Sequence, residues 1–227
     1  MINVETHLPN PEAIKRYDGS SWRAFHTPDG THLIVTQRGL ELLKFNPALR
    51  KAILNYRDDA NPFSHSTTGA RTYFKAGGNG DVYNLDSYPI LIKESFSQHS
   101  LWSALDRMDH LHGICIRYLP PSIRVPDQYG VLFSRKSPKE YLMMQKINEG
   151  LTVADIINGY SVGKSLREVI LREFSTLREK VEAAIKVKDG DSGIYSNLLP
   201  DWDAGNILVD LGTKTKDYPF TFWIIDQ

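Results

Sequence analysis

Short apolar runs broken by turn residues dominate residues 71 to 150. The runs RTYF, DVYNL and PILIK are separated by KAGGNG and DSYP, which predicts two antiparallel hairpin connections in series. Further runs, GICIRY, YGVLFS and EYLMMQ, have the composition of strands. Between them, four residues recur at helical spacing and predict one helix face: Leu101, Leu105, Met108 and His112.

After Gly150 the periodicity becomes helical. TVAD, from Thr152, and SLRE, from Ser165, each have the form of an N-terminal helix cap. An apolar stripe at helical spacing follows the second of these and stops at KDGDSG; its members are Leu166, Val169, Ile170, Phe174, Leu177, Val181 and Ile185. Near the end, NILVD and FTFWIID flank the polar LGTKTKDYP, which predicts a hairpin.

The order of these patterns predicts an α+β protein. A β-rich half with one helix precedes a helix-rich half with one late hairpin. The first 70 residues give mixed indications: a turn at TPDG, a strand at HLIVT and helical spacing in PALRKAILNYRDD. Because DANPFSHSTTGA is loop-like, we expect an N-terminal extension over residues 1–70, a second part over 71–150 and a third over 151–227.

Composition narrows the class of protein. The 227 residues are 41% apolar, which is enough for a sizeable core, and 27 basic residues balance 27 acidic ones. Overall charge therefore favours neither nucleic acid nor an anionic membrane as a partner. The lone Cys115 cannot form an internal disulfide and the N-terminus lacks the apolar core of a signal peptide, so we expect a cytoplasmic protein. No apolar run approaches the roughly 18 residues of a membrane span.

A glycine-rich connection and a lysine suggest phosphate chemistry. Gly77, Gly78 and Gly80 lie between two predicted strands, where backbone N–H groups can approach a phosphate closely. Lys93 ends the apolar strand PILIK, and an inward lysine there calls for an anion. The plain alternatives are a glycine-rich hairpin turn and a lysine that reaches solvent. The pattern is not a P-loop, because no Lys-Ser or Lys-Thr follows and the next element is a strand.

Oxygen ligands gather in LPDWDAGNILVD and after the final strand. Asn206 and Asp226 would suit Mg²⁺ if they lie at neighbouring strand ends, and Asp201 could then orient or deprotonate a hydroxyl. A calcium loop is set aside, because Gly205, Asn206 and Gly212 occupy the places of an oxygen ligand, a glycine and a glutamate. A plain acidic turn remains an alternative for this segment.

Taken in order, a glycine-rich hairpin, a strand lysine, a helix, YLMMQKINEG, a long helix, DWDAGN and IIDQ resemble the protein-kinase-like fold. The resemblance is to its atypical aminoglycoside-phosphotransferase and RIO-like branches, and it covers roughly residues 71–227. It implies a two-lobed fold, with a β-rich N-lobe and hinge over 71–150 and a reduced, mainly helical C-lobe over 151–227. ATP and Mg²⁺ are the implied cofactors.

The resemblance also implies roles for the nucleotide-binding residues. Gly77 and Gly80 match the second and third glycines of the glycine-rich loop, and Val82 the residue that packs over adenine. Lys93 matches the lysine that contacts the α and β phosphates, with Asp109 as the favoured acidic partner on the next helix.

The hinge and the catalytic loop carry the remaining implied roles. Backbone groups of Gln145 to Ile147 would bind adenine, with Met144 behind it. Asp201 takes the place of the catalytic base, while Asn206 and Asp226 take those of the metal ligands.

Three departures from the family pattern bear on activity. Leu199 replaces the usual histidine before the base, Asp203 adds a negative charge near the transferred phosphate, and DQ replaces DFG. The sequence also stops at Gln227, so we expect a minimal version of the fold, a fragment, or support from the first 70 residues.

Two functions compete. The first is an ATP- and Mg²⁺-dependent kinase acting on a hydroxyl of an unidentified protein or small molecule. The second is a pseudokinase-like module that binds a nucleotide or a partner without phosphate transfer. Transfer of AMP on the same fold is a further alternative.

Overall fold

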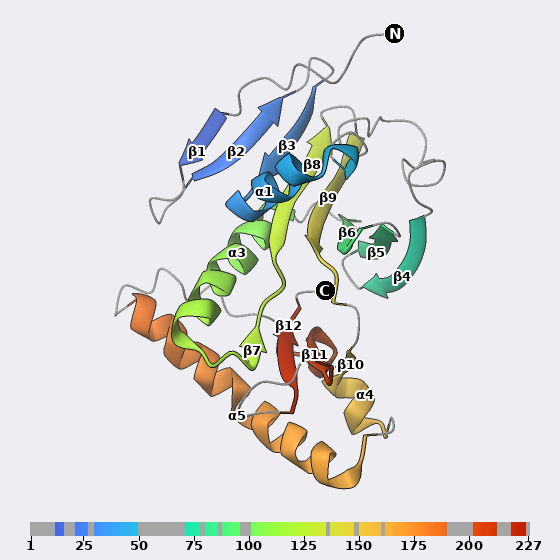
Figure 1. Ribbon diagram of the computed structural model, residues 1–227, viewed down its shortest axis with the longest axis vertical. Helices are drawn as coiled ribbons and strands as arrows, with labels where there is room; N and C mark the ends of the chain where they lie inside the picture. The colour runs from blue at the N-terminus through green and yellow to red at the C-terminus, as the bar shows by residue number, and fades with distance from the viewer. Residues whose placement is uncertain are drawn as a thin grey trace. The chain divides into compact units, whose positions relative to one another are not determined.

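The computed structural model describes residues 12–15, 21–26, 30–49, 71–77, 80–85, 88–95, 101–134, 137–147, 150–159, 162–189, 202–212 and 219–225 (Figure 1). Strands and helices are both abundant, so the predicted α+β class is confirmed. The chain divides into two compact units, Met1–Leu105 with Asp127–Lys146, and Asp106–Pro126 with Ile147–Gln227.

One antiparallel sheet of eight strands forms the first unit, in the order β1-β2-β3-β8-β9-β6-β5-β4. Its strands are β1 (Glu12–Lys15), β2 (Ser21–His26), β3 (Thr31–Val35), β4 (Arg71–Gly77), β5 (Gly80–Leu85), β6 (Ile90–Ser95), β8 (Gln128–Ser134) and β9 (Ser137–Gln145). The strands within residues 12–35 thus extend the same sheet from β8, rather than forming a sheet of their own.

Both faces of this sheet bury apolar side chains. Helix α1 (Gln37–Phe45) lies over one face of the sheet (Figure 1). Its Leu43 belongs to a cluster that contains Leu33, Ile92 and Met143 from that face. The opposite face, with Trp22, Ile34, Val131, Leu142 and Met144, packs against the start of α3 (Leu101–Tyr118) through Leu101 and Leu105. Because successive strand residues point to opposite faces, strands buried on both sides read as continuous apolar runs.

The second unit packs helices against a small sheet in the order β10-β11-β12-β7. Its strands are β7 (Ile123–Arg124), β10 (Leu151–Thr152), β11 (Ile207–Asp210) and β12 (Thr221–Ile224); its helices are α4 (Val153–Ile157), the long α5 (Lys164–Asp189) and the 3₁₀ turn η2 (Ala204–Asn206). One apolar cluster joins α5, the later turns of α3 and the sheet, and includes Leu111, Ile170, Leu177, Ile207 and Phe220.

Most elements predicted from periodicity are present. Strands β4, β5 and β6 and the β11–β12 hairpin lie where their apolar runs place them. The apolar stripe lies within α5, which ends at Asp189, inside KDGDSG. Thr152 caps α4 in a full capping box with Asp155, as TVAD predicts.

Two predicted features are wrong. GICIRY is the end of helix α3 and not a strand, because Leu111, Ile114 and Cys115 continue its buried face at helical spacing. This burial outweighs the strand preference of β-branched residues. Nor does SLRE cap α5: the helix begins at Lys164, and the N–H of Arg167 already donates to the carbonyl of Gly163.

Helix α1 is an element that sequence reading missed. Gly39 within the segment QRGLELLKF weakens its helical propensity. The available indication was Thr36, a good N-cap residue placed directly before it. Of the predicted helical segment PALRKAILNYRDD, only the first residues, 47–49, lie within the described part, and these are helical. Among the described residues, no helix combines the length and apolar character that crossing a membrane requires.

Candidate nucleotide and catalytic site

The glycine-rich connection is the turn of a hairpin. Gly77 ends β4 and Gly80 begins β5, and the two are directly opposed in the ladder. Gly78 and Asn79, which join them, lie outside the described residues. Because Gly77 and Gly80 have no side chains, a ligand could approach their backbone more closely than at other residues.

Val82 and Lys93 are cross-strand partners on β5 and β6. Directly opposed residues of antiparallel strands project from the same face of the sheet, so the valine and the lysine stem lie side by side. Both are buried, with 8% of Val82 and 5% of Lys93 exposed. A lysine buried to this extent beside a glycine hairpin is a candidate to hold an anion, since water hydrates little of its charge.

Met144 lies on the same sheet face as this pair. Lys93 is opposed to Leu142 on β9, and Leu91 to Met144, so the alternation along each strand places all four on one side. The structure therefore places Val82, Lys93 and Met144 on one face of three adjacent strands, while their role in nucleotide binding stays a prediction.

Two backbone donors of the hinge segment are already engaged. The N–H of Gln145 donates to the carbonyl of Asp127 at 2.8 Å, and the N–H of Lys146 donates to that of Pro89 at 2.9 Å. Neither can donate to adenine without losing a protein partner. The N–H of Ile147 is therefore the candidate donor to adenine in this segment, and the carbonyl groups of Gln145 to Ile147 are candidate acceptors.

Asn206, in the second unit, is anchored within η2. Its N–H donates to the carbonyl of Asp203 at 2.9 Å, and its own carbonyl accepts the N–H of Ile225 at 2.8 Å. The residue is 9% exposed. Asp226 follows Ile225 in the sequence, but it lies outside the described residues, as does Asp201.

Asp203 caps the 3₁₀ turn η2, a role that its position in the sequence did not indicate. Its carboxylate accepts the N–H of Gly205 at 2.6 Å and so caps η2. An acidic residue at this place satisfies an N–H that the turn leaves without a backbone partner. Asp203 therefore caps the turn that holds Asn206.

The predicted acidic partner of Lys93 belongs to the other compact unit. Asp109 lies on α3 in the second unit, whereas Lys93 belongs to the first. Their pairing remains a prediction. Nor does the described part of the chain gather three or more His, Cys, Asp or Glu side chains into a metal-binding group.

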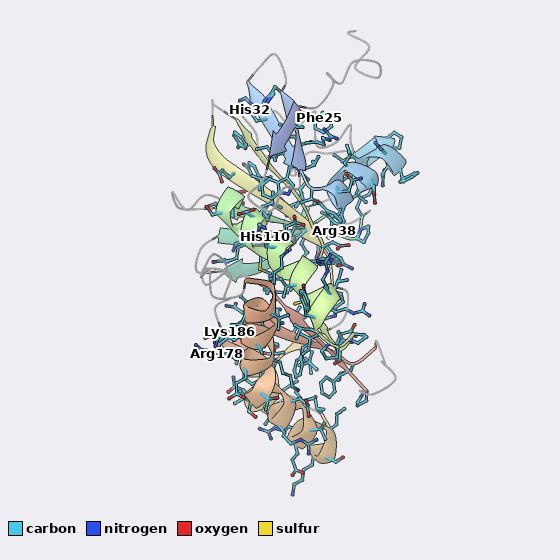
Figure 2. All side chains as sticks on the ribbon, turned by 90° about the vertical axis from the view of Figure 1, so that its left-hand side faces the viewer. Phe25, His32, Arg38, His110, Arg178 and Lys186 are labelled. Carbon is cyan, nitrogen blue, oxygen red and sulfur yellow. The ribbon has the colours of Figure 1, made fainter. Side chains whose placement is uncertain are left out.

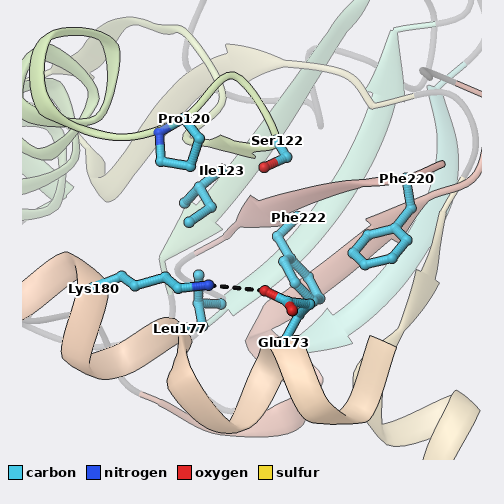
Figure 3. A pocket seen from close by; sticks show the side chains of 8 residues that line it. All are labelled: Pro120, Ser122, Ile123, Glu173, Leu177, Lys180, Phe220 and Phe222. Carbon is cyan, nitrogen blue, oxygen red and sulfur yellow. Dashed lines mark hydrogen bonds and ion pairs between the residues drawn. The ribbon is translucent and has the colours of Figure 1, made fainter. Parts of the chain in front are cut away.

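A pocket in the second unit lies apart from these residues. It is a small hollow between α5, β12 and the turn before β7, with a cavity volume of only about 10 Å³ (Figure 3). Its lining is mostly apolar, with an ion pair between Lys180 Nζ and Glu173 Oε2 at 2.8 Å. None of the residues predicted to bind nucleotide or metal lines it.

Comparison with known proteins gives little likeness. No family model and no curated protein matches this sequence. Among solved structures, the chain is similar to the PknI kinase domain of Mycobacterium tuberculosis, crystallised as a double mutant, with 14% identity and a TM-score of 0.37. The likeness covers 71% of this chain and 63% of that domain.

Proposed function

We propose that this protein is an ATP- and Mg²⁺-dependent phosphotransferase with an atypical protein-kinase-like fold. The observation that carries the proposal is the buried pair of Val82 and Lys93, directly opposed on adjacent strands beside the Gly77–Gly80 hairpin. A nucleotide triphosphate needs a cation and close backbone N–H groups for its phosphates, and its base needs an apolar surface. These features occur together on three neighbouring strands.

The nucleotide roles follow from the chemistry of each group. Lys93 binds the α and β phosphates, and the backbone of Gly77 to Gly80 covers the phosphate chain. Val82 and Met144 contact the adenine from the sheet face they share. The N–H of Ile147 donates to the base, since those of Gln145 and Lys146 are engaged.

Phosphoryl transfer requires a metal and a base as well. The oxygens of Asn206 and Asp226 are hard ligands that suit Mg²⁺, which neutralises charge on the phosphates. The acceptor hydroxyl of a protein or small molecule attacks the γ phosphorus, its proton passes to Asp201, and the bond to the bridging oxygen breaks to release ADP. Asp109 is the proposed acidic partner of Lys93.

Nucleotide binding is tested by thermal denaturation with ATP, with and without Mg²⁺. We expect ATP to raise the Tm of the native protein in a Mg²⁺-dependent way. In Lys93→Met or Asp226→Ala the rise should be smaller, corresponding to an apparent affinity for ATP at least about tenfold lower. Lys188→Met, at an exposed position on α5, is the matched control and should behave as the native protein. An equal rise in Tm for Lys93→Met would disprove the phosphate role of this lysine.

Transfer is tested separately from binding. Radiolabelled ATP turnover should be lost in Asp201→Ala while nucleotide binding persists. Binding without turnover in the native protein would favour the pseudokinase-like alternative. Mass spectrometry of the product then distinguishes a phosphoryl from an adenylyl group. ATP turnover that persists unchanged in Asp226→Ala would rule out the metal role proposed for that residue.

A further inference from the structure

Helix α1 docks on an irregular part of strand β8. The pairing of β8 with β9 shifts between Gln128 and Gly130. There the hydroxyl of Thr36 donates to the carbonyl of Gln128 at 2.6 Å, and the N–H of Thr36 donates to that of Tyr129 at 3.1 Å. The same hydroxyl accepts the N–H of Gly39 at 3.0 Å. The bulge thus supplies the carbonyls that hold the first turn of the helix.

The side chain of Arg38 extends this docking to the residue before the bulge. Figure 2 labels Arg38. Its Nε lies 3.1 Å from Oδ1 of Asp127, and both side chains are 30% exposed. The contact is an ion pair rather than a directed hydrogen bond, because Nε–H makes no hydrogen bond in this geometry. The pKa of Tyr129 is raised to about 12 by burial and by the Asp127 charge, against a lowering by Arg38. Tyr129, Asp127 and Arg38 therefore interact electrostatically in a region that is partly shielded from water.

Asp127 in turn holds the hinge. Its carbonyl accepts the N–H of Gln145 at 2.8 Å, and its own N–H donates to the side-chain oxygen of Gln145 at 3.1 Å. The backbone N–H and the side-chain oxygen of Gln145 are therefore both hydrogen-bonded to Asp127. Asp127 is also the residue whose carboxylate forms the ion pair with Arg38 of α1.

We propose that α1 fixes the hinge in the conformation that receives the adenine, with Arg38 and Asp127 as positioning residues. This inference rests on the proposed nucleotide site at Gln145 to Ile147. The ion pair restrains Asp127, and Asp127 restrains Gln145 through two hydrogen bonds. The N–H of Ile147, two residues later, is therefore already in position for adenine before the nucleotide binds. A donor held in place before binding contributes more affinity than one that must be ordered by the ligand.

Amide hydrogen exchange of the ligand-free protein tests the structural link. In Arg38→Gln, and likewise in Asp127→Asn, the amides of Gln145 and Lys146 should exchange about three- to fivefold faster, while those of β5 keep their protection. Arg178→Gln is the matched control, because Arg178 forms an exposed ion pair with Glu182 on α5 in the second unit. Combining Arg38→Asp with Asp127→Arg should restore the slow exchange. Native protection of Gln145 in Arg38→Gln would overturn the proposal.

Affinity measurements separate this inference from the proposed function. Arg38→Gln should bind MgATP about three- to fivefold more weakly but inorganic tripolyphosphate as tightly as the native protein, since only the adenine contacts the hinge. Equal weakening of both ligands would overturn the hinge role, as would unchanged MgATP affinity in a variant whose hinge exchanges faster. If the native protein binds neither ligand, the proposed function fails and the adenine part of this inference fails with it. Hydrogen exchange then decides the link between α1 and the hinge.

Discussion

A Cβ atom placed on Gly39 would lie 1.9 Å from the carbonyl oxygen of Tyr129. The backbone of α1 approaches β8 so closely that only glycine fits at this position. Gly39→Ala should therefore move the helix away from the bulge and lower the free energy of unfolding by about 3 kcal/mol. Urea denaturation measures this change.

Gly113 on α3 is the matched control for that substitution. A Cβ atom added there meets nothing within 4 Å, and the residue lies on the exposed side of the helix. Gly113→Ala should stabilise the protein by about 0.5 to 1 kcal/mol, because alanine restricts the unfolded chain. Similar effects of the two substitutions would contradict the close approach of α1 to β8.

Asp203 offers a test of the cap on η2. Asp203→Ala removes the acceptor for the N–H of Gly205 and should cost about 1 kcal/mol of stability. Asp203→Asn retains an acceptor without the charge, so its stability should stay close to the native value. Chemical denaturation of both variants measures the difference. Equal loss in the two would show that the charge, rather than the hydrogen bond, stabilises the turn.

The Cys115 thiol gives a prediction for pH dependence. Burial raises its pKa from 9.0 to about 12. The folded thiol therefore keeps its proton where the unfolded thiol loses it, and this contribution to stability is complete below pH 9. It is lost as pH rises from about 9 to about 12, by up to about 1.4 kcal/mol per pH unit.

Comparison with Cys115→Ala isolates that contribution from other groups that titrate in the same range. Between pH 8 and pH 10 the free energy of unfolding of the native protein should fall more than that of Cys115→Ala. A difference independent of pH would contradict the raised pKa. The native thiol should also resist Ellman's reagent until the protein is unfolded, since a buried thiol forms little thiolate.

The ion pair on α5 that lines the pocket should contribute only modestly to the free energy of unfolding. Glu173 and Lys180 are 18% and 39% exposed at the side chain, so water still screens part of their attraction. A double-mutant cycle with Glu173→Gln and Lys180→Met should give a coupling of about 0.5 to 1 kcal/mol. The more exposed pair Arg178 and Glu182 should give less. Coupling that persists undiminished in 1 M salt would argue against this electrostatic account.

Local pattern was sufficient for several elements. Alternating and continuous apolar runs predict β4, β5 and β6, and a stripe at helical spacing predicts α5, because each depends on which face is buried. The same patterns place the glycines next to one hairpin and Lys93 on a strand, although β6 continues to Ser95 rather than ending at the lysine. The identity of these residues is therefore readable from sequence, whereas their chemical roles remain predictions.

Pattern failed where distant partners decide the conformation. GICIRY has the residues of a strand, but it forms a helix because the second unit buries Ile114 and Cys115 together on one side. Helix α1 carries a helix-weakening glycine, but carbonyls of a strand about 90 residues later hold its first turn. Neither outcome follows from neighbours in the sequence.

The sequence by itself determined the α+β class, the glycine hairpin, a lysine within a strand and the long amphipathic helix, since these follow from short-range periodicity; the burial of that lysine was decided by the tertiary structure. Only the tertiary structure decided that Val82 faces Lys93, that Asp203 caps the turn holding Asn206, and that residues 12–35 extend the sheet from β8. Strand order and register depend on contacts between segments far apart in the chain, which no local pattern specifies.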